Sequence, residues 1–122
     1  MPHLLIVDDE PEIRRLYAAE LEDEGYTVTT AANPLQAVDH LRSESIDLMV
    51  LDIQLQGESG LQTLQNVVQE FPDLPVILCT AFSCYKDDFS SWLADGYVVK
   101  SSDLNELKSE INKVLARGKS SG

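Results

Sequence analysis

Basic residues are scarce in this chain. Its 122 residues include 9 Lys and Arg against 21 Asp and Glu, which gives a formal net charge of −12 at pH 7. No stripe of Lys or Arg forms along any of the helices that the sequence predicts. Because nucleic acids and anionic membrane surfaces attract basic patches, we expect this chain to bind neither of them directly.

Long apolar runs are absent as well. No segment approaches the ~20 consecutive apolar residues that span a bilayer, and no charged-then-apolar signal segment precedes His3. We therefore expect a soluble, cytoplasmic protein. Cysteine is rare: Cys79 falls within a predicted buried strand and Cys84 in the loop after it. A bond between the two is conceivable, but we expect free thiols in a reducing cytosol.

The apolar content is that of an ordinary globular protein. At 122 residues and 43% hydrophobic, the chain suits one compact domain, which buries roughly two-thirds of the surface that the unfolded chain exposes. We assign residues 1–117 to this domain. Residues 118–122 have no apolar periodicity, and we interpret them as a linker stub or a tail.

Short apolar segments alternate with helical patterns throughout the domain. The predicted strands are Leu4–Val7, Tyr26–Thr30, Ile46–Leu51, Val76–Thr80 and Tyr97–Val99. The predicted helices run from Pro11 to Gly25, from Asn33-Pro34 onward, from about Ser59 to Phe71-Pro72, over about Asp87–Ala94, and onward from Asp103. In the first helix the apolar positions expected to face inward are Ile13, Leu16, Tyr17 and Leu21. Apolar strands joined by helical crossovers indicate a parallel sheet with helices on both faces.

Polar side chains stand at the ends of four of these strands. They are Asp8 and Asp9, Asp52, Thr80 and Lys100. The carboxyl ends of parallel strands share one edge of a sheet, where ligands bind, so we expect these residues to converge. Three carboxylates repel one another, each pair by on the order of 4 kcal/mol at ~4 Å in an effective dielectric near 20. The amine and a divalent cation would balance them, and oxygen ligands without His or Cys favour magnesium over zinc.

This set of residues can carry out phosphoryl chemistry. A carboxylate beside magnesium and an amine can attack phosphorus and form an aspartyl phosphate, which makes Asp52 the candidate nucleophile. The protein contributes placement and charge neutralisation. Thr80 could donate its hydroxyl to one phosphoryl oxygen, and Lys100 could pair with another.

Taken together, the motifs resemble the receiver (phosphoacceptor) domains of bacterial two-component response regulators. The segments that carry the resemblance are Ile6–Glu10, Val50–Ile53, Thr80-Ala81 and Tyr97–Lys100, and the likeness extends from about Pro2 to Arg117. It implies an α/β, flavodoxin-like, doubly wound fold. Such a fold has a five-stranded parallel sheet of order 2-1-3-4-5 and five helices, in three layers.

The resemblance also implies a role for each acid. Asp52 would be the phosphorylated residue and a ligand of Mg²⁺ (or Mn²⁺). Asp9 would bind the metal directly, Asp8 would hold it mainly through water, and Gln54 would contribute its backbone carbonyl.

Thr80 and Lys100 would complete the catalytic set, and Thr80 and Tyr97 would act as the switch residues. Phosphorylation would then change the surface of the fourth helix, fifth strand and fifth helix. Two positions depart from the family pattern: Ser101 and Gln56 stand where proline is usual. The first leaves the isomer of the Lys100-Ser101 peptide open, because the family's proline there often has a cis bond.

The function implied is a signalling receiver. It would take a phosphoryl group from a histidine kinase or a histidine phosphotransfer protein and act on a downstream protein or a fused output domain. It would catalyse its own magnesium-dependent phosphorylation and dephosphorylation, without turning over a small-molecule substrate. One alternative is a phosphorylation-independent binding module of the same fold, favoured only by Ser101. A small-molecule phosphatase is disfavoured, because Gln54 stands where such enzymes need a second acid.

Overall fold

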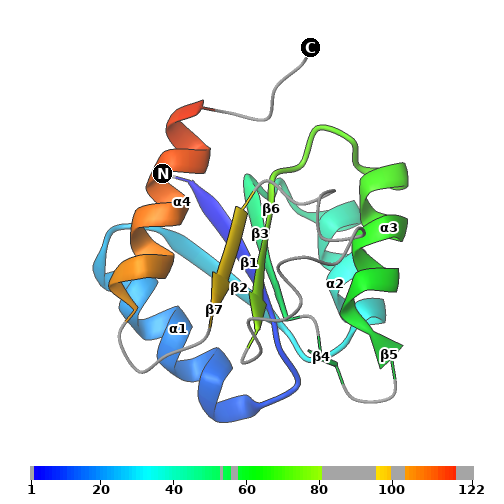
Figure 1. Cartoon of the computed structure of the whole chain (residues 1–122), viewed down its shortest axis with the longest axis horizontal. Helices are drawn as coiled ribbons and strands as arrows, with labels where there is room; N and C mark the ends of the chain where they lie inside the picture. The colour runs from blue at the N-terminus through cyan, green and yellow to red at the C-terminus, as the bar shows by residue number, and fades with distance from the viewer. Residues whose placement is uncertain (1, 53, 56–57, 81–95, 100–103, 118–122) are drawn as a thin grey trace.

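From β1 to β3, strands and helices alternate along the chain as the sequence predicts (Figure 1). The computed structural model describes residues 2–52, 54–55, 58–80, 96–99 and 104–117. The elements are β1 (His3–Val7), α1 (Pro11–Asp23), β2 (Thr27–Ala31), α2 (Pro34–Ser43), β3 (Leu48–Asp52), β4 (Gln54–Leu55), β5 (Glu58–Ser59), α3 (Gly60–Glu70), β6 (Val76–Thr80), β7 (Gly96–Val99) and α4 (Asn105–Arg117).

One parallel sheet forms the centre of the molecule. Its five strands lie in the order β2-β1-β3-β6-β7. Because β6 and β7 are the fourth and fifth of the predicted strands, this order is the predicted 2-1-3-4-5, and the flavodoxin-like fold is confirmed. The strand order reverses between β1 and β3, and the crevice outside such a reversal is where doubly wound sheets bind ligands.

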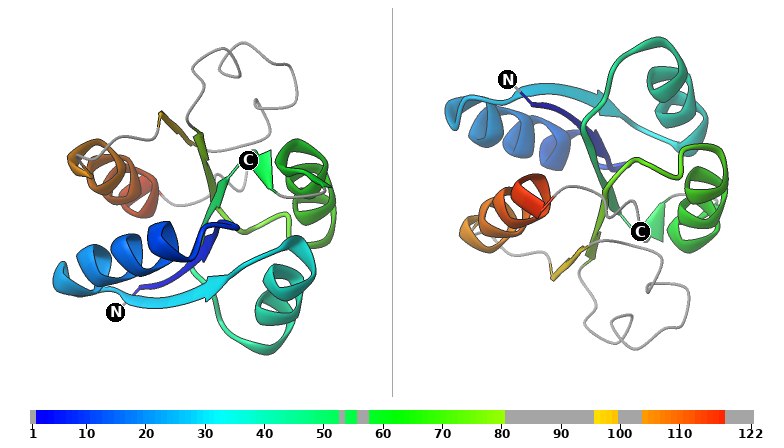
Figure 2. Two further views of the ribbon diagram at one scale, coloured as in Figure 1. Left: turned by 90° about the horizontal axis from the view of Figure 1, so that it is seen from below. Right: turned by 90° about the horizontal axis from the view of Figure 1, so that it is seen from above.

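Helices cover both faces of the sheet in three layers (Figure 2). On one face, α2 and α3 contribute Ala37, Leu41, Leu64 and Val67 to an apolar cluster. On the other, α1 and α4 contribute Tyr17, Leu21, Leu107, Ile111 and Val114 to a second cluster. Alternate residues of the central strands supply both clusters, which is why these strands are apolar throughout. The helix expected at Asp87–Ala94 lies outside the described residues, as do Cys84 and Asp103.

The helix ends follow the predicted signals. The Oδ1 of Asn33 accepts a hydrogen bond of 2.9 Å from the backbone N–H of Gln36, and Pro34 is the first residue of α2. After α1, Gly25 has a φ of 99°, a left-handed conformation that glycine adopts without strain. No helix in the described part of the chain is long and apolar enough to cross a bilayer.

Three details differ from the sequence expectation. Strand β2 begins one residue later and β3 two residues later than predicted. Leu16, expected to face inward, is 44% exposed, because the buried stripe of α1 follows Tyr17 and Leu21 at a spacing of four and leaves Leu16 beside it. The segment after β3 also contains a short antiparallel hairpin, β4–β5, where the sequence predicted only a loop.

A polar cluster ties β1, β2 and α2 together at the amino edge of the sheet. The two histidines of the chain both approach Glu44. His40 Nδ1 lies 2.6 Å from Glu44 Oε2 and His3 Nε2 lies 3.6 Å from Glu44 Oε1. Thr29 Oγ1 donates a hydrogen bond of 3.1 Å to the same carboxylate. The hydrogen bond to His40 is the largest cause of a lowered pKa at Glu44. The hydrogen bond from Thr29 and the charge of His3 also lower the pKa of Glu44.

This cluster predicts a pH effect on stability. Because folding lowers the pKa of Glu44, its contribution is present above about pH 4.5, the ordinary value, and is lost as the pH falls through the folded-state pKa. The unfolding midpoint in urea should therefore fall less between pH 5 and pH 3 in Glu44→Gln than in the wild type. Glu22→Gln, at an exposed position on α1, is the matched control. Its urea midpoint should fall as much between pH 5 and pH 3 as that of the wild type. An equal fall of the midpoint in Glu44→Gln and the wild type would contradict a stabilising role of the Glu44 carboxylate.

Candidate functional site

The ends of β1 and β3 bring two carboxylates together. Val7 and Leu51 pair in register, and each is followed directly by an aspartate, Asp8 or Asp52. Asp8 is 2% exposed and Asp52 is 4% exposed. Burying two carboxylates costs free energy unless hydrogen bonds or cations compensate for the lost hydration. Because this cost is not repaid by packing, the two buried carboxylates indicate a functional site.

Asp8 also belongs to a compact group of acids in the turn between β1 and α1. Asp8, Asp9 and Glu10 each offer a carboxylate oxygen, and these three atoms lie within 4.8 Å of one another. Their exposure increases along the chain: Asp8 is buried, Asp9 is half-buried and Glu10 is exposed. Among the described residues this is a donor set of oxygen atoms alone, which suits a hard divalent cation such as magnesium.

Hydrogen bonds hold Asp8 at both backbone groups and at its side chain. Its N–H donates to the carbonyl of Ala31 in β2 over 3.1 Å. Its Oδ1 accepts from the N–H of Glu10 over 2.9 Å. Its carbonyl accepts from Nη1 of Arg14 over 2.7 Å. The position of Asp8 is thus set by β2, by the turn and by α1.

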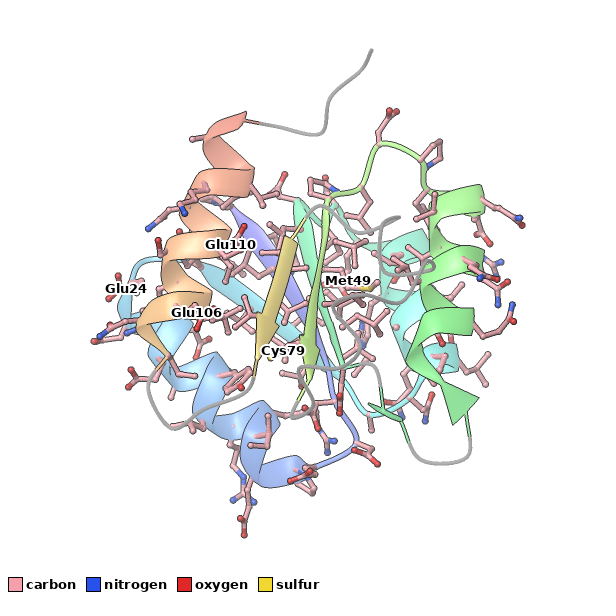
Figure 3. The ribbon with its side chains drawn as sticks, in the orientation of Figure 1. Glu24, Met49, Cys79, Glu106 and Glu110 are labelled. Atoms are coloured by element: carbon pink, nitrogen blue, oxygen red, sulfur yellow. The ribbon has the colours of Figure 1, made fainter. Side chains whose placement is uncertain are left out.

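A tyrosine and a cysteine lie beneath the acids, on the face covered by α1 and α4. Cys79 pairs with Asp52 in the register of β3 and β6, and Figure 3 shows it near the carboxyl end of β6. Tyr17 Oη lies 3.7 Å from Cys79 Sγ. Burial is the main cause of a raised pKa at Tyr17, and Cys79 and the negative charges of Asp8 and Asp52 raise it further. The phenol is therefore neutral at physiological pH, and Cys79 is a buried cysteine of strand β6.

The remaining predicted site residues are only partly located. Thr80 ends β6 and pairs with Val99 at the edge that carries the acids. Tyr97 pairs with Leu78 from the edge strand β7, and Gln54 opens β4 two residues after Asp52. Lys100 and Ser101, with the peptide between them, lie outside the described residues, and so does Gln56.

Three neighbours of the site did not stand out from the sequence as functional residues. Glu10 is the third acid of the group, Arg14 binds the Asp8 carbonyl, and Tyr17 lies below. Glu10 could have been found, because it directly follows the acidic pair. Tyr17 was indistinguishable from the other apolar positions of α1, and nothing in the spacing of Arg14 indicates that its side chain turns back toward β1.

Similar solved structures have the same fold. The response regulator TrrA of Thermotoga maritima in complex with Mg(2+)-BeF is 45% identical to this chain, with a TM-score of 0.89, and the match covers 93% of this chain and 99% of that chain. TrrA in complex with the histidine kinase ThkA matches with 45% identity and a TM-score of 0.88, over 94% of this chain and 99% of that one.

Curated relatives are longer. The probable transcriptional regulator ycf27 of Cyanidium caldarium is 37% identical over 94% of this chain and 47% of its own length. The response regulator SaeR of Staphylococcus aureus is 38% identical over 98% of this chain and 53% of its own. This chain therefore spans about half the length of the curated relatives it matches. Residues 4–112 match the model of the response regulator receiver domain, and the chain belongs to that family.

Proposed function

We propose that this chain is a phosphorylation-dependent receiver in which Asp52 accepts a phosphoryl group from a phosphohistidine. The observation that carries the proposal is the burial of Asp52 beside Asp8 at the ends of adjacent strands, next to the acids of the β1–α1 turn. A histidine kinase or a histidine phosphotransfer protein would be the donor. The solved complex of the related TrrA with the kinase ThkA supports a kinase as partner.

Magnesium, or manganese, is the cofactor that the acids suit. Asp9 is the direct ligand in this proposal because it is half-buried and within reach of solvent, whereas the Oδ1 of Asp8 already accepts a bond from Glu10. Asp8 would hold the ion through water, and Asp52 and the carbonyl of Gln54 would complete the protein ligands. The ion would neutralise the carboxylates and the charge that develops on the phosphoryl oxygens. The complex of TrrA with Mg(2+)-BeF supports this choice.

The signal would leave through the switch residues. Lys100 and Thr80 would contact the phosphoryl oxygens, and Tyr97 would follow the movement of Thr80 and change the surface of the fourth predicted helix, β7 and α4. Adding a charge that biases a two-state element is the general logic of phosphorylation switches. A downstream protein or a fused output domain would read that surface, and the greater length of the curated relatives supports the second possibility.

The setting proposed for the chain follows from its composition. Residues 1–117 would be the receiver domain and 118–122 a linker stub or a tail. With a net charge of −12, the domain itself would bind neither nucleic acid nor membrane. The buried thiol of Cys79 fits the cytoplasm, where thiols stay reduced.

Phosphorylation by a small donor tests the function directly. Incubation of the chain with acetyl phosphate and magnesium should raise its intact mass by ~80 Da, the mass of one phosphoryl group in an aspartyl phosphate. Excess chelator should prevent the gain, because the repulsion between the acids would then oppose the incoming phosphoryl group. A chain that never gains mass, with acetyl phosphate or with a phosphorylated histidine kinase, would instead be a phosphorylation-independent binding module.

A further inference from the structure

Arg14 spans the turn between β1 and α1. Its backbone N–H donates to the carbonyl of Glu10 over 3.1 Å, which is the first hydrogen bond of the helix. Its guanidinium turns back and donates from Nη1 to the carbonyl of Asp8 over 2.7 Å. One residue therefore binds the turn at two points, one on each side of Asp9.

The cap of the helix adds no side-chain hydrogen bond to this turn. Glu10 is the N-cap of α1, and its side chain makes no capping hydrogen bond. The bond from the Glu10 N–H to Asp8 Oδ1 closes the turn locally. A hydrogen bond to the Asp8 carbonyl fixes the orientation of the peptide group that joins Asp8 to Asp9. That orientation sets the direction in which the Asp9 side chain leaves the backbone, and so its distance from the neighbouring carboxylates.

The charge of Arg14 acts at the same place. The three carboxylates of Asp8, Asp9 and Glu10 lie within 4.8 Å of one another and repel. A guanidinium keeps its positive charge at every physiological pH, and a hydrogen bond from a charged donor is stronger than one between neutral groups. Without this bond, the repulsion between the acids would act on a turn that is held less firmly on its helix side.

We propose that Arg14 is a positioning residue for the acidic group: by holding the Asp8 carbonyl, it keeps the three carboxylates at the spacing that a divalent cation requires. The part of this inference that concerns metal rests on the proposed function. The part that concerns the turn does not, because the hydrogen bond joins two residues of this chain directly. Supporting residues of this kind commonly change metal affinity by about 10- to 100-fold when they are removed.

Arg15 provides a matched control. It is the next residue of α1, carries the same charge, is exposed, and lines with Arg14 the same hollow of about 210 Å³ beside Thr30. Removal of either arginine deletes one positive charge from the first half of α1, but the hydrogen bond to the Asp8 carbonyl comes from Arg14. A comparison of the two alanine variants therefore separates the hydrogen bond from the charge. Arg14→Lys retains the charge and one donor, and should rescue part of the effect.

The first measurement is the magnesium affinity, obtained by NMR titration in 0.15 M and 1 M KCl. Arg14→Ala should weaken magnesium binding by about tenfold at both salt concentrations. Arg15→Ala should stay within about twofold of the wild type. Any effect of its charge should be smallest in 1 M KCl, where the screening length is about 3 Å. Arg14→Lys should fall between the wild type and Arg14→Ala. Equal affinities in Arg14→Ala and Arg15→Ala would overturn the inference.

The second measurement needs no metal. Amide hydrogen exchange of Glu10 should accelerate by about tenfold in Arg14→Ala, because loosening the turn exposes the bond to Asp8 Oδ1, while the amide of Leu21 in the middle of the core should change far less. A uniform acceleration along α1 would mean that Arg14 only stabilises the fold, and the proposal would be wrong. If the wild type itself binds no magnesium, the proposed function fails, and the exchange of Glu10 still decides the role of Arg14.

Discussion

Replacement of Asp52 by asparagine is expected to abolish phosphorylation. The amide has the same shape as the carboxylate but cannot attack phosphorus. The neighbouring acids Asp8 and Asp9 lie in the turn after β1, whereas Asp52 ends β3. With acetyl phosphate and magnesium, the intact mass of Asp52→Asn should stay that of the unmodified protein. The matched control is Asp73→Asn, the same substitution at an exposed position, which should gain ~80 Da as one phosphoryl group. A mass gain that survives in Asp52→Asn would move the acceptor to another residue.

The same substitution should make the metal-free protein more stable. Asp52 is 4% exposed and adjoins Asp8, which is 2% exposed, so the wild type keeps like charges together in a region of low dielectric. Removing one charge should raise the free energy of unfolding by on the order of 1 kcal/mol. Urea denaturation in the presence of a chelator measures this, and Asp73→Asn should change little. A lower stability of Asp52→Asn would mean that hydrogen bonds to the carboxylate outweigh the repulsion.

The second large effect is expected at Asp9. Its carboxylate is half-buried and belongs to the group of three acids, whereas the more deeply buried Asp8 already accepts a hydrogen bond from Glu10. Asp9→Ala should therefore weaken magnesium binding by more than tenfold, and Asp8→Ala should have a smaller effect. Calorimetric or NMR titration measures the affinities directly. Thermal unfolding is an independent readout, because a ligand at 100 times its dissociation constant stabilises the folded state by about 2.7 kcal/mol.

Glu10→Ala separates the proposed ligand from a general effect of negative charge. Glu10 is exposed and sits at the outer side of the acids, so its removal should reduce the magnesium affinity less than the removal of Asp9. Equal losses in the two variants would indicate that the ion is held by the summed field of the acids and not by one direct ligand. Unchanged binding in Asp9→Ala would place the metal elsewhere.

Most of the fold was predictable because the central strands are apolar on both faces. Segments such as Val76–Thr80 cannot be confused with amphipathic helices once Gly, Pro and Asn mark the intervals between them, and the structure places them in one parallel sheet. The hairpin β4–β5 was missed because each of its strands has only two residues, which is too short for any periodicity. Leu16 was placed wrongly because a spacing of three or four residues permits two neighbouring stripes on α1, and only packing selects between them.

The site was predictable to the extent that it depends on strand ends. Convergence of Asp8, Asp9 and Asp52 follows from parallel strands alone, and the structure confirms that Asp8 and Asp52 follow paired residues. The hydrogen bond from Arg14 was not predictable, because a long flexible side chain can reach several carbonyls and the sequence does not say which. The roles of Lys100 and Thr80 stay predictions.

Among the described residues, the sheet separates the interior into two cores that share no helix. One contains Leu64 of α3 and the other contains Ile111 of α4, and only the backbone of the sheet lies between them. Substitutions that have no common neighbours combine additively in their effect on stability. Evolution can therefore remodel the helices on one face without compensating changes on the other, and the two faces of a single receiver are free to diverge at different rates while the acids at the sheet edge stay in place.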